Sequence, residues 1–236
     1  MISKLVQTEF MKLRRKGIWF LTFLGPFGVV ALQMVNYGLR KDWFISQGTY
    51  EWFYYVRNVS AFTPFALILG IVILTSFMAS IESETKAWKQ VMALPVTKWS
   101  VYIAKYTTLV ALLMIACLLL VIFTLCFGLY LGFDGNVPYL DIIKYSYYPF
   151  IAALPVLGLQ LWLATVSQNQ GLPITLGVLG VILSYMAYFL PDWMIWKWPS
   201  LDNAWDEPLV NVGLGLAVGL GIYLIGMIDF IRRDVK

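Results

Sequence analysis

Residues 81–98 read IESETKAWKQVMALPVTK and form a polar stretch between two long apolar runs. From Glu84 onward the apolar residues recur every three or four positions, at Ala87, Trp88, Val91 and Leu94. This spacing predicts a short amphipathic helix. Acidic residues begin the helix, as the helix dipole favours, and Pro95 ends it. The helix could dock on another protein, or it could be an interfacial loop helix with a solvated basic face.

The composition around this stretch is that of a membrane protein, with 60% hydrophobic and 13% charged residues among 236. Windows without Asp, Glu, Lys or Arg cover residues 17–39, 58–81, 106–133, 145–191 and 208–228. Each is long enough for a span of about 20 residues, and the fourth is long enough for two. We expect that window to break at SQNQGLP, residues 167–173. The sequence therefore predicts a single all-α membrane domain over residues 1–236 with six transmembrane helices.

The distribution of lysine and arginine predicts the orientation of the chain. Twelve of them fall on the side of the two termini: Lys4, Lys12, Arg14, Arg15, Lys16, Lys86, Lys89, Lys98, Lys105, Arg232, Arg233 and Lys236. Five fall on the opposite side: Arg40, Lys41, Arg57, Lys144 and Lys197. Because cytosolic loops carry the excess of positive charge, we expect both termini and residues 82–98 in the cytosol.

Two flanking segments are expected at the membrane interfaces. Residues 2–16 place Ile2, Leu5, Val6, Phe10 and Leu13 along one face, which predicts an interfacial helix at the inner surface. Residues 191–208 carry four acids and four tryptophans, Trp193, Trp196, Trp198 and Trp205. Since tryptophan favours the headgroup level, we expect short interfacial pieces here at the outer surface.

Three further expectations concern the margins of the spans. Residues 50–55, rich in aromatic side chains, read as an aromatic belt in an outer loop before a span over residues 61–80. Residues 134–144 read as another outer loop. The third apolar run is longer than a bilayer needs, so we expect its first turns to project into the cytosol with Lys105.

Polar and small residues inside the spans allow two interpretations each. Gln33, Asn36 and Gln160 could line a substrate pathway, or they could form hydrogen bonds between packed helices. In the last span, small residues recur every four positions in two rows, one at 213, 217 and 221 and one at 215 and 219. These rows permit close helix contact, either with a second subunit or within the chain.

The sequence lacks the residues that most enzymes of this size would need. It contains no histidine and no G-x-x-x-x-G-K-[ST] motif, so it has neither a His-based metal or triad site nor a Walker motif for ATP. No paired acids or nucleophile-base set supports a membrane-embedded hydrolase. No charged residue lies at the middle of a span, which disfavours an ion-coupled carrier. We therefore expect a non-catalytic chain without a cofactor of its own.

The layout of interfacial helix, six spans, cytosolic helix after the second span and outer segment before the sixth resembles the permease subunits of ABC-2-type transporters. The local sequence ETKAWKQVMALPVTKWSVYIAKY, residues 84–106, most resembles the short permeases of lantibiotic-immunity and bacitracin-type exporters. In that family an acidic residue opens the helix, a Leu-Pro pair closes it and basic residues follow. The matching positions here are Glu84, Leu94, Pro95, Lys98 and Lys105.

The resemblance implies an exporter of an amphiphilic antimicrobial peptide in a bacterial plasma membrane. ATP and Mg²⁺ would bind a separate ABC ATPase dimer, and a second permease, identical or related, would complete the pathway. The coupling helix would insert into the ATPase with Trp88, Val91 and Leu94 as apolar contacts and Glu84, Lys86 and Lys89 as charged contacts at the rim. The candidate pathway residues would be Gln33, Asn36, Gln160, Trp196 and Trp198. A non-transporting immunity or scaffold protein, or a permease for another lipid-like substrate, remains the alternative.

Overall fold

The structure, a computed structural model, describes residues 2–14, 17–40, 46, 51–84, 97–133, 135–167, 169 and 171–233. Within these residues the chain is helical and contains no strand. The α-helices are α1 (Ile2–Arg14), α2 (Ile18–Leu39), α4 (Glu51–Glu84), α6 (Lys98–Leu131), α7 (Tyr139–Ala152), α8 (Leu154–Val166), α9 (Gly171–Tyr185) and α10 (Pro208–Arg232). Two 3₁₀ turns, η2 (Ala187–Phe189) and η3 (Trp198–Ser200), lie between α9 and α10.

Four of the described helices, α2, α4, α6 and α10, are long and apolar enough to cross a membrane. The pair α7 and α8 is bent by 42° and provides a fifth span if the two helices cross together. The helix α9 is apolar but has 15 residues, which extend about 22 Å, less than the roughly 30 Å of a bilayer core. The chain is thus a multi-pass membrane protein, while the sixth predicted span is not confirmed by this count.

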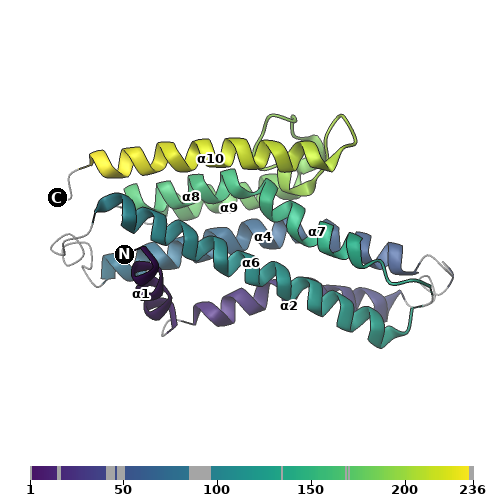
Figure 1. The fold of residues 1–236 in the computed structure, drawn as a ribbon. Coiled ribbons are helices and arrows are strands. Elements are labelled where there is room, and N and C mark those ends of the chain that lie inside the picture. Colours follow the sequence, from purple (N-terminus) through teal and green to yellow (C-terminus); the bar gives the residue numbers. More distant parts are fainter. Residues whose placement is uncertain are drawn as a thin grey trace.

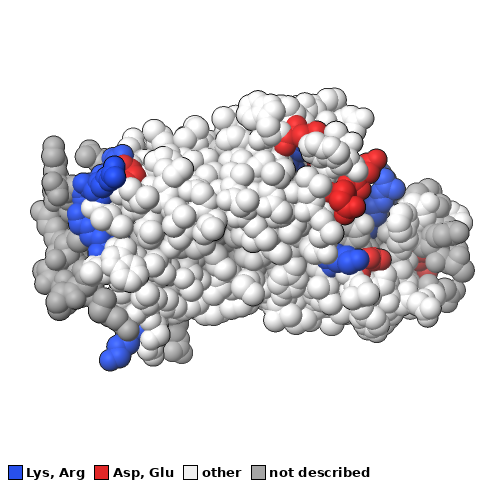
Figure 2. Space-filling view, turned by 45° about the horizontal axis from the view of Figure 1, so that its top comes forward, with Lys and Arg blue, Asp and Glu red and all other residues white. Residues whose placement is uncertain are grey.

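The long helices run side by side, and α1 lies across one end of the bundle (Figure 1). The C-terminal end of α10 reaches the same end. Charged side chains gather at the two ends of the molecule and leave an uncharged belt between them (Figure 2). Lys and Arg dominate on the visible face at the end with α1, whereas acids and bases mix at the opposite end. This pattern is what a bilayer around the middle of the bundle requires.

The amphipathic pattern of α1 matches its packing. Leu13 is buried, and the other apolar residues of the predicted face are half-buried: Ile2, Leu5, Val6 and Phe10. This face packs mainly against α6. The N-terminal helix is therefore held by protein contacts along its apolar side.

The aromatic residues before the second span differ from the prediction of an outer loop belt. The helix α4 begins at Glu51, and Trp52 and Tyr55 are buried in its first turns. The Trp52 ring lies where a Cβ at Gly128 of α6 would stand, so only glycine leaves room for it. Tyr55 donates a hydrogen bond to the carbonyl of Thr124 at 3.1 Å. Trp52 and Tyr55 are buried, while Phe53 stays exposed, because α6 supplies a partner on one face of α4 that periodicity alone does not reveal.

The predicted outer loop over residues 134–144 is also partly helical. The helix α7 begins at Tyr139, directly after Pro138, and Asp141 lies in its first turn. A proline before the first turn and an acid within it both favour a helix start.

The break predicted at residues 167–173 agrees with the structure, because α8 ends at Val166 and α9 begins at Gly171.

The two rows of small residues in α10 have different environments. A Cβ at Gly215 would lie 2.5 Å from the Cα of Ala152, and one at Gly219 would lie 2.8 Å from the Cβ of Leu154. Cβ atoms at Gly213 and Gly221 would meet nothing within 4 Å. One row therefore seals α10 against α7 and α8, and the other faces outward.

Candidate functional site

The segment between α4 and α6 contains most of the predicted coupling residues. Lys86, Trp88, Lys89, Val91 and Leu94 lie outside the described residues. Glu84 is the last residue of α4, which continues past the predicted end of the second span, and Lys98 is the first residue of α6. Both ends of the predicted helix 82–98 therefore belong to the neighbouring long helices.

Lys98 joins the start of α6 to the end of α10. Its Nζ donates to the carbonyl of Arg233 at 2.7 Å and to that of Ile231 at 3.2 Å. The last carbonyls of a helix have no partner inside the helix and carry the negative end of its dipole. The ammonium group of Lys98 donates hydrogen bonds to these carbonyls and places a positive charge at the negative end of the dipole. The first residue of α6 is thus bound to the C-terminal end of α10.

Asp229 extends this connection to α8. Its Oδ2 accepts a hydrogen bond from Trp162 Nε1 at 2.9 Å and pairs with Arg233 Nε at 3.0 Å. The helices α6, α8 and α10 are in this way linked at the same end of the bundle by the side chains of Lys98, Trp162, Asp229 and Arg233.

A buried ion pair connects α1 to α6 at this end. Lys105 is fully buried, and its Nζ lies 3.5 Å from Glu9 Oε2. Lys12 Nζ also contacts Glu9, at 2.7 Å from Oε1. Lys105 is not exposed, because α1 packs on it, and the projection of the first turns of α6 into the cytosol stays a prediction. Glu9 was missed as a site residue, although its position four residues from both Leu5 and Leu13 places an acid within the apolar face.

The electrostatics of Glu9 follow from this pairing. Burial by itself raises the pKa of a carboxyl, but the charge of Lys105 and the hydrogen bond and charge of Lys12 act in the opposite direction. Together the two lysines hold the pKa of Glu9 below its ordinary value. The carboxylate is therefore charged at neutral pH and binds α1 to α6.

The pathway candidates of α2 form a small polar group with α4. Gln33 is buried, and its amide donates to the carbonyl of Asn58 at 3.5 Å. Asn36 donates to Gln33 Oε1 at 3.3 Å. The bond of Gln33 to Asn58 joins α2 to α4, and Asn36 supports it from within α2, which is the helix-packing role that the sequence also allowed.

Gln160 and Trp196 line a separate cavity, away from Gln33 and Asn36. Gln160 is buried in α8 and donates to the carbonyl of Pro173 at 2.7 Å. With Trp196, Gly177 and Val72 it lines a cavity of about 190 Å³. The five pathway candidates therefore do not converge on one site. Gln33 and Asn36 form one group, and Gln160 and Trp196 form another.

Trp198 belongs to a hydrogen-bonded cap made by residues 191–208, the segment predicted to lie at the outer surface. The Trp198 ring is buried, and its Nε1 donates to the carbonyl of Asp192 at 2.6 Å. Asn211, at the start of α10, donates to the carbonyls of Trp198 and Asp202 and accepts from Asn203. Asn211 is only 1% exposed, so the cap is fixed by a buried amide rather than by surface contacts.

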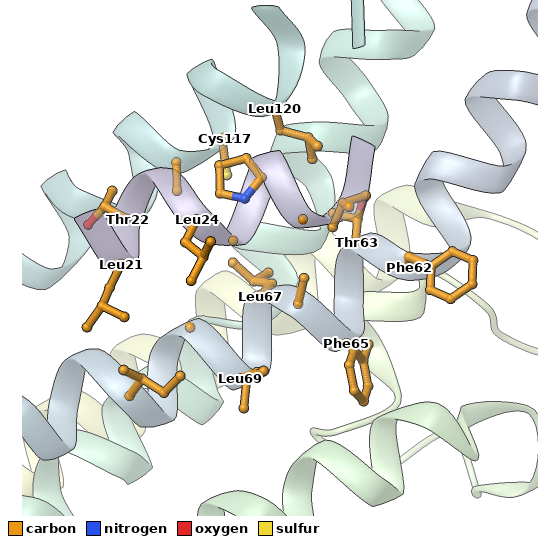
Figure 3. A pocket seen from close by; sticks show the side chains of 18 of the residues that line it. Leu21, Thr22, Leu24, Phe62, Thr63, Phe65, Leu67, Leu69, Cys117 and Leu120 are labelled. Carbon is orange, nitrogen blue, oxygen red and sulfur yellow. The ribbon is translucent and has the colours of Figure 1, made fainter. Parts of the chain in front are cut away.

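A second cavity is a groove of about 540 Å³ that α2 and α4 line with α6 behind them (Figure 3). Its walls are almost entirely apolar, and they include Leu21, Leu24 and Leu32 of α2, Leu69 of α4 and Cys117 of α6. No sequence pattern indicated this groove, because it forms where three separate helices pack together.

One of three comparisons with known proteins finds a match. A family model described as ABC-2 family transporter protein matches residues 5–184, which covers most of the chain. The chain belongs to the ABC-2 transporter family. An ABC-2 permease is the membrane-embedded transport subunit, and the ATPase activity of the transporter resides in a partner ABC subunit. The match to the ABC-2 family ends before the outer cap and α10. No curated protein and no solved structure matches the chain.

Proposed function

We propose that this chain is the permease subunit of an ABC exporter that expels an amphiphilic antimicrobial peptide, of the lantibiotic or bacitracin type, from a bacterial plasma membrane. The helices α2, α4, α6, α7 with α8, α9 and α10 form six spans, and α1 is the interfacial elbow helix. A separate ABC ATPase dimer binds ATP and Mg²⁺. A second permease, identical or related, completes the pathway.

The observation that carries this proposal is the connection of the two helices that flank residues 85–96. The helices α4 and α6 have 34 residues each and run without a break from this end into the bundle. The first residue of α6 binds the end of α10, and Lys105 of α6 pairs with α1. A displacement of the segment by an ATPase would therefore move α4, α6, α10 and α1 together.

The exposed tryptophans of the outer cap support the proposal that the substrate binds at the membrane surface. Trp193 and Trp205 expose 72% and 64% of their surface on the cap, whereas Trp198 is buried and holds it together. Exposed indole rings on a rigid support suit an amphiphilic peptide that lies at the headgroup level. A scaffold that only sequesters the peptide would use the same surface, but it would not stimulate ATP hydrolysis. A permease for another lipid-like substrate would respond to that substrate instead.

The decisive experiment replaces Trp88 by alanine. If residues 84–94 dock on the ATPase, the loss of a large aromatic anchor should weaken association by about 2 kcal/mol or more, roughly a 30-fold change in affinity. Co-purification with the ATPase and peptide-stimulated ATP turnover measure this effect. Trp99→Ala is the matched control, because Trp99 is a half-exposed tryptophan just inside α6. Normal assembly and turnover of Trp88→Ala would rule out docking through this segment.

The orientation has its own test. Single cysteines at Ala204 in the outer cap and at Gln7 in α1 are both exposed positions. In a background without Cys117 and Cys126, an impermeant thiol reagent should label the first in intact cells and the second only after lysis. Labelling of the Gln7 site in intact cells would overturn cytosolic termini.

A further inference from the structure

The groove between α2 and α4 is open along its side. The residues at its rim are exposed although they are large and apolar: Leu24, Leu32, Val35, Phe62, Phe65 and Leu69. Along α2 the lining extends from Leu21 to Val35, which corresponds to about 21 Å. Figure 3 shows the side chains of both helices around this channel, with Phe65 and Leu69 on the α4 side.

Glycines widen the groove. Gly25 and Gly28 of α2 and Gly70 of α4 all line it, and a Cβ on any of them would meet nothing within 4 Å. The space is therefore not filled by a neighbouring helix within the described chain, and it could accept larger side chains without overlap.

The lining offers few hydrogen-bonding groups to a ligand, and besides two hydroxyls only the weakly polar thiol of Cys117 contributes a side chain. The two hydroxyls belong to Thr22 and Thr63, and each donates to the carbonyl four residues earlier in its own helix, at 3.0 and 2.9 Å. An extended peptide in the groove would leave its own backbone amides unpaired at several kcal/mol per group. The lining therefore suits a ligand that needs no hydrogen bonds.

Water fits the groove poorly, because each molecule in a cavity needs polar partners. A hydrocarbon chain is slender enough to enter, and it restores the van der Waals contacts that an empty groove lacks.

We propose that the groove of α2, α4 and α6 is a binding site for an acyl chain of a phospholipid from the surrounding bilayer, which enters from the side past Leu69. Because lipid tails are as apolar as the groove, the site is selected by shape and by the high lipid concentration rather than by the hydrophobic effect. This site is independent of the identity of the exported substrate.

Photo-crosslinking tests the proposal on the full chain in vesicles of phosphatidylcholine and phosphatidylglycerol. A small fraction of the phosphatidylcholine carries a diazirine in the middle of one acyl chain, and mass spectrometry maps the crosslinks after irradiation. We expect the lining of α2 and α4 to be labelled more strongly, per exposed area, than Leu216, Leu220 and Leu224, exposed apolar residues of α10.

Variants whose larger side chains fill the groove provide the matched comparison for the crosslinking. The double variant Gly28→Leu/Gly70→Leu should lose most of the groove labelling. Gly213→Leu/Gly221→Leu, with the same exchange at open positions of α10, should keep it. Leu69→Trp at the rim is a second blocking variant, in case the double variant does not fold.

Two results would overturn the proposal. The first is groove labelling no stronger than that of α10 and unchanged in both blocking variants, which would mean ordinary contact with bilayer lipid. The second is a disulfide between two copies through Leu69→Cys, in a background without Cys117 and Cys126, together with absent groove labelling. That result would assign the groove to a second permease.

Discussion

The Nζ of Lys105 in α6 lies 3.5 Å from Oε2 of Glu9 in α1, and both residues are buried. This contact fixes the first helix of the chain to the helix that follows the 85–96 segment. Removing one charge of such a pair leaves the other without its counter-charge in a poorly solvated site. The pair is therefore expected to matter more than the surface ion pairs of the chain.

Glu9→Gln should destabilise the packing of α1 by about 3 kcal/mol. Thermal unfolding in detergent or nanodiscs measures the loss. The double variant Glu9→Gln/Lys105→Met should recover part of it, because neither charge is then left alone. Lys4→Met on the exposed side of α1 is the control and should change little. Equal stability of Glu9→Gln and the wild-type chain would contradict this role.

The same carboxylate predicts a pH dependence. The pKa of Glu9 is lowered in the folded chain, so its contribution to stability is complete above its ordinary value of 4.5 and is lost as the pH falls through the lowered pKa. Melting temperatures measured from pH 7 to pH 3 should show this loss only below about pH 4.5. In Glu9→Gln that part of the decrease should be missing. An unchanged pH profile in the variant would show that other acids control it.

Lys98→Met should reduce coupling to the ATPase while changing the stability of the chain little. The methionine keeps the length of the side chain but cannot donate to the carbonyls of Ile231 and Arg233. Because these contacts are exposed, the stability loss should stay near 1 kcal/mol or less. If α6 and α10 move together, peptide-stimulated ATP turnover should fall while basal turnover and assembly with the ATPase are retained. Unchanged stimulation would mean that α10 does not take part in coupling.

The two glycine rows of α10 predict opposite signs for the same substitution. Gly215→Ala should destabilise the chain by about 1–3 kcal/mol, since its Cβ would overlap Ala152. Gly213→Ala has free space and should be neutral or stabilising by up to about 1 kcal/mol. Unfolding midpoints of both variants under one condition provide the comparison. A loss of similar size at Gly213 would instead indicate that its face is covered by a partner.

Asn211→Leu should disrupt the outer cap. The leucine keeps the volume but leaves the carbonyls of Trp198 and Asp202 without their donor, at a cost of about 1–3 kcal/mol. Limited proteolysis should then cut between residues 191 and 208, while the spans remain protected. Resistance to proteolysis equal to that of the wild-type chain would show that the amide does not hold the cap.

Windows without charge predicted the long apolar helices well, because a bilayer imposes length and polarity on each span separately. The start of α4 at Glu51 and of α7 at Tyr139 was not predicted, since partner helices, and not local composition, bury Trp52 and Tyr55. The pair of Glu9 and Lys105 was missed for a similar reason. Each residue looks like a surface charge in its own helix, and only the packing of α1 on α6 brings them together.

The residues of the candidate site were also predicted only in part. Gln33 and Gln160 lie inside the helices α2 and α8, but the sequence did not distinguish a pathway role from a packing role for either residue. Their hydrogen bonds to Asn58 and Pro173 depend on how neighbouring helices are arranged. The coupling residues from Lys86 to Leu94 lie outside the described residues and remain a prediction.

The contact of Gly215 and Gly219 with α7 and α8 restricts what α10 can do during a transport cycle. Turning α10 about its axis by one residue, 100°, would bring Leu214, Leu216 or Leu220 into a space where even a methyl group overlaps the backbone. The helix therefore has a single rotational register against its neighbours. A rearrangement that keeps these contacts therefore moves α10 together with α8 and with the end of α7 at Ala152.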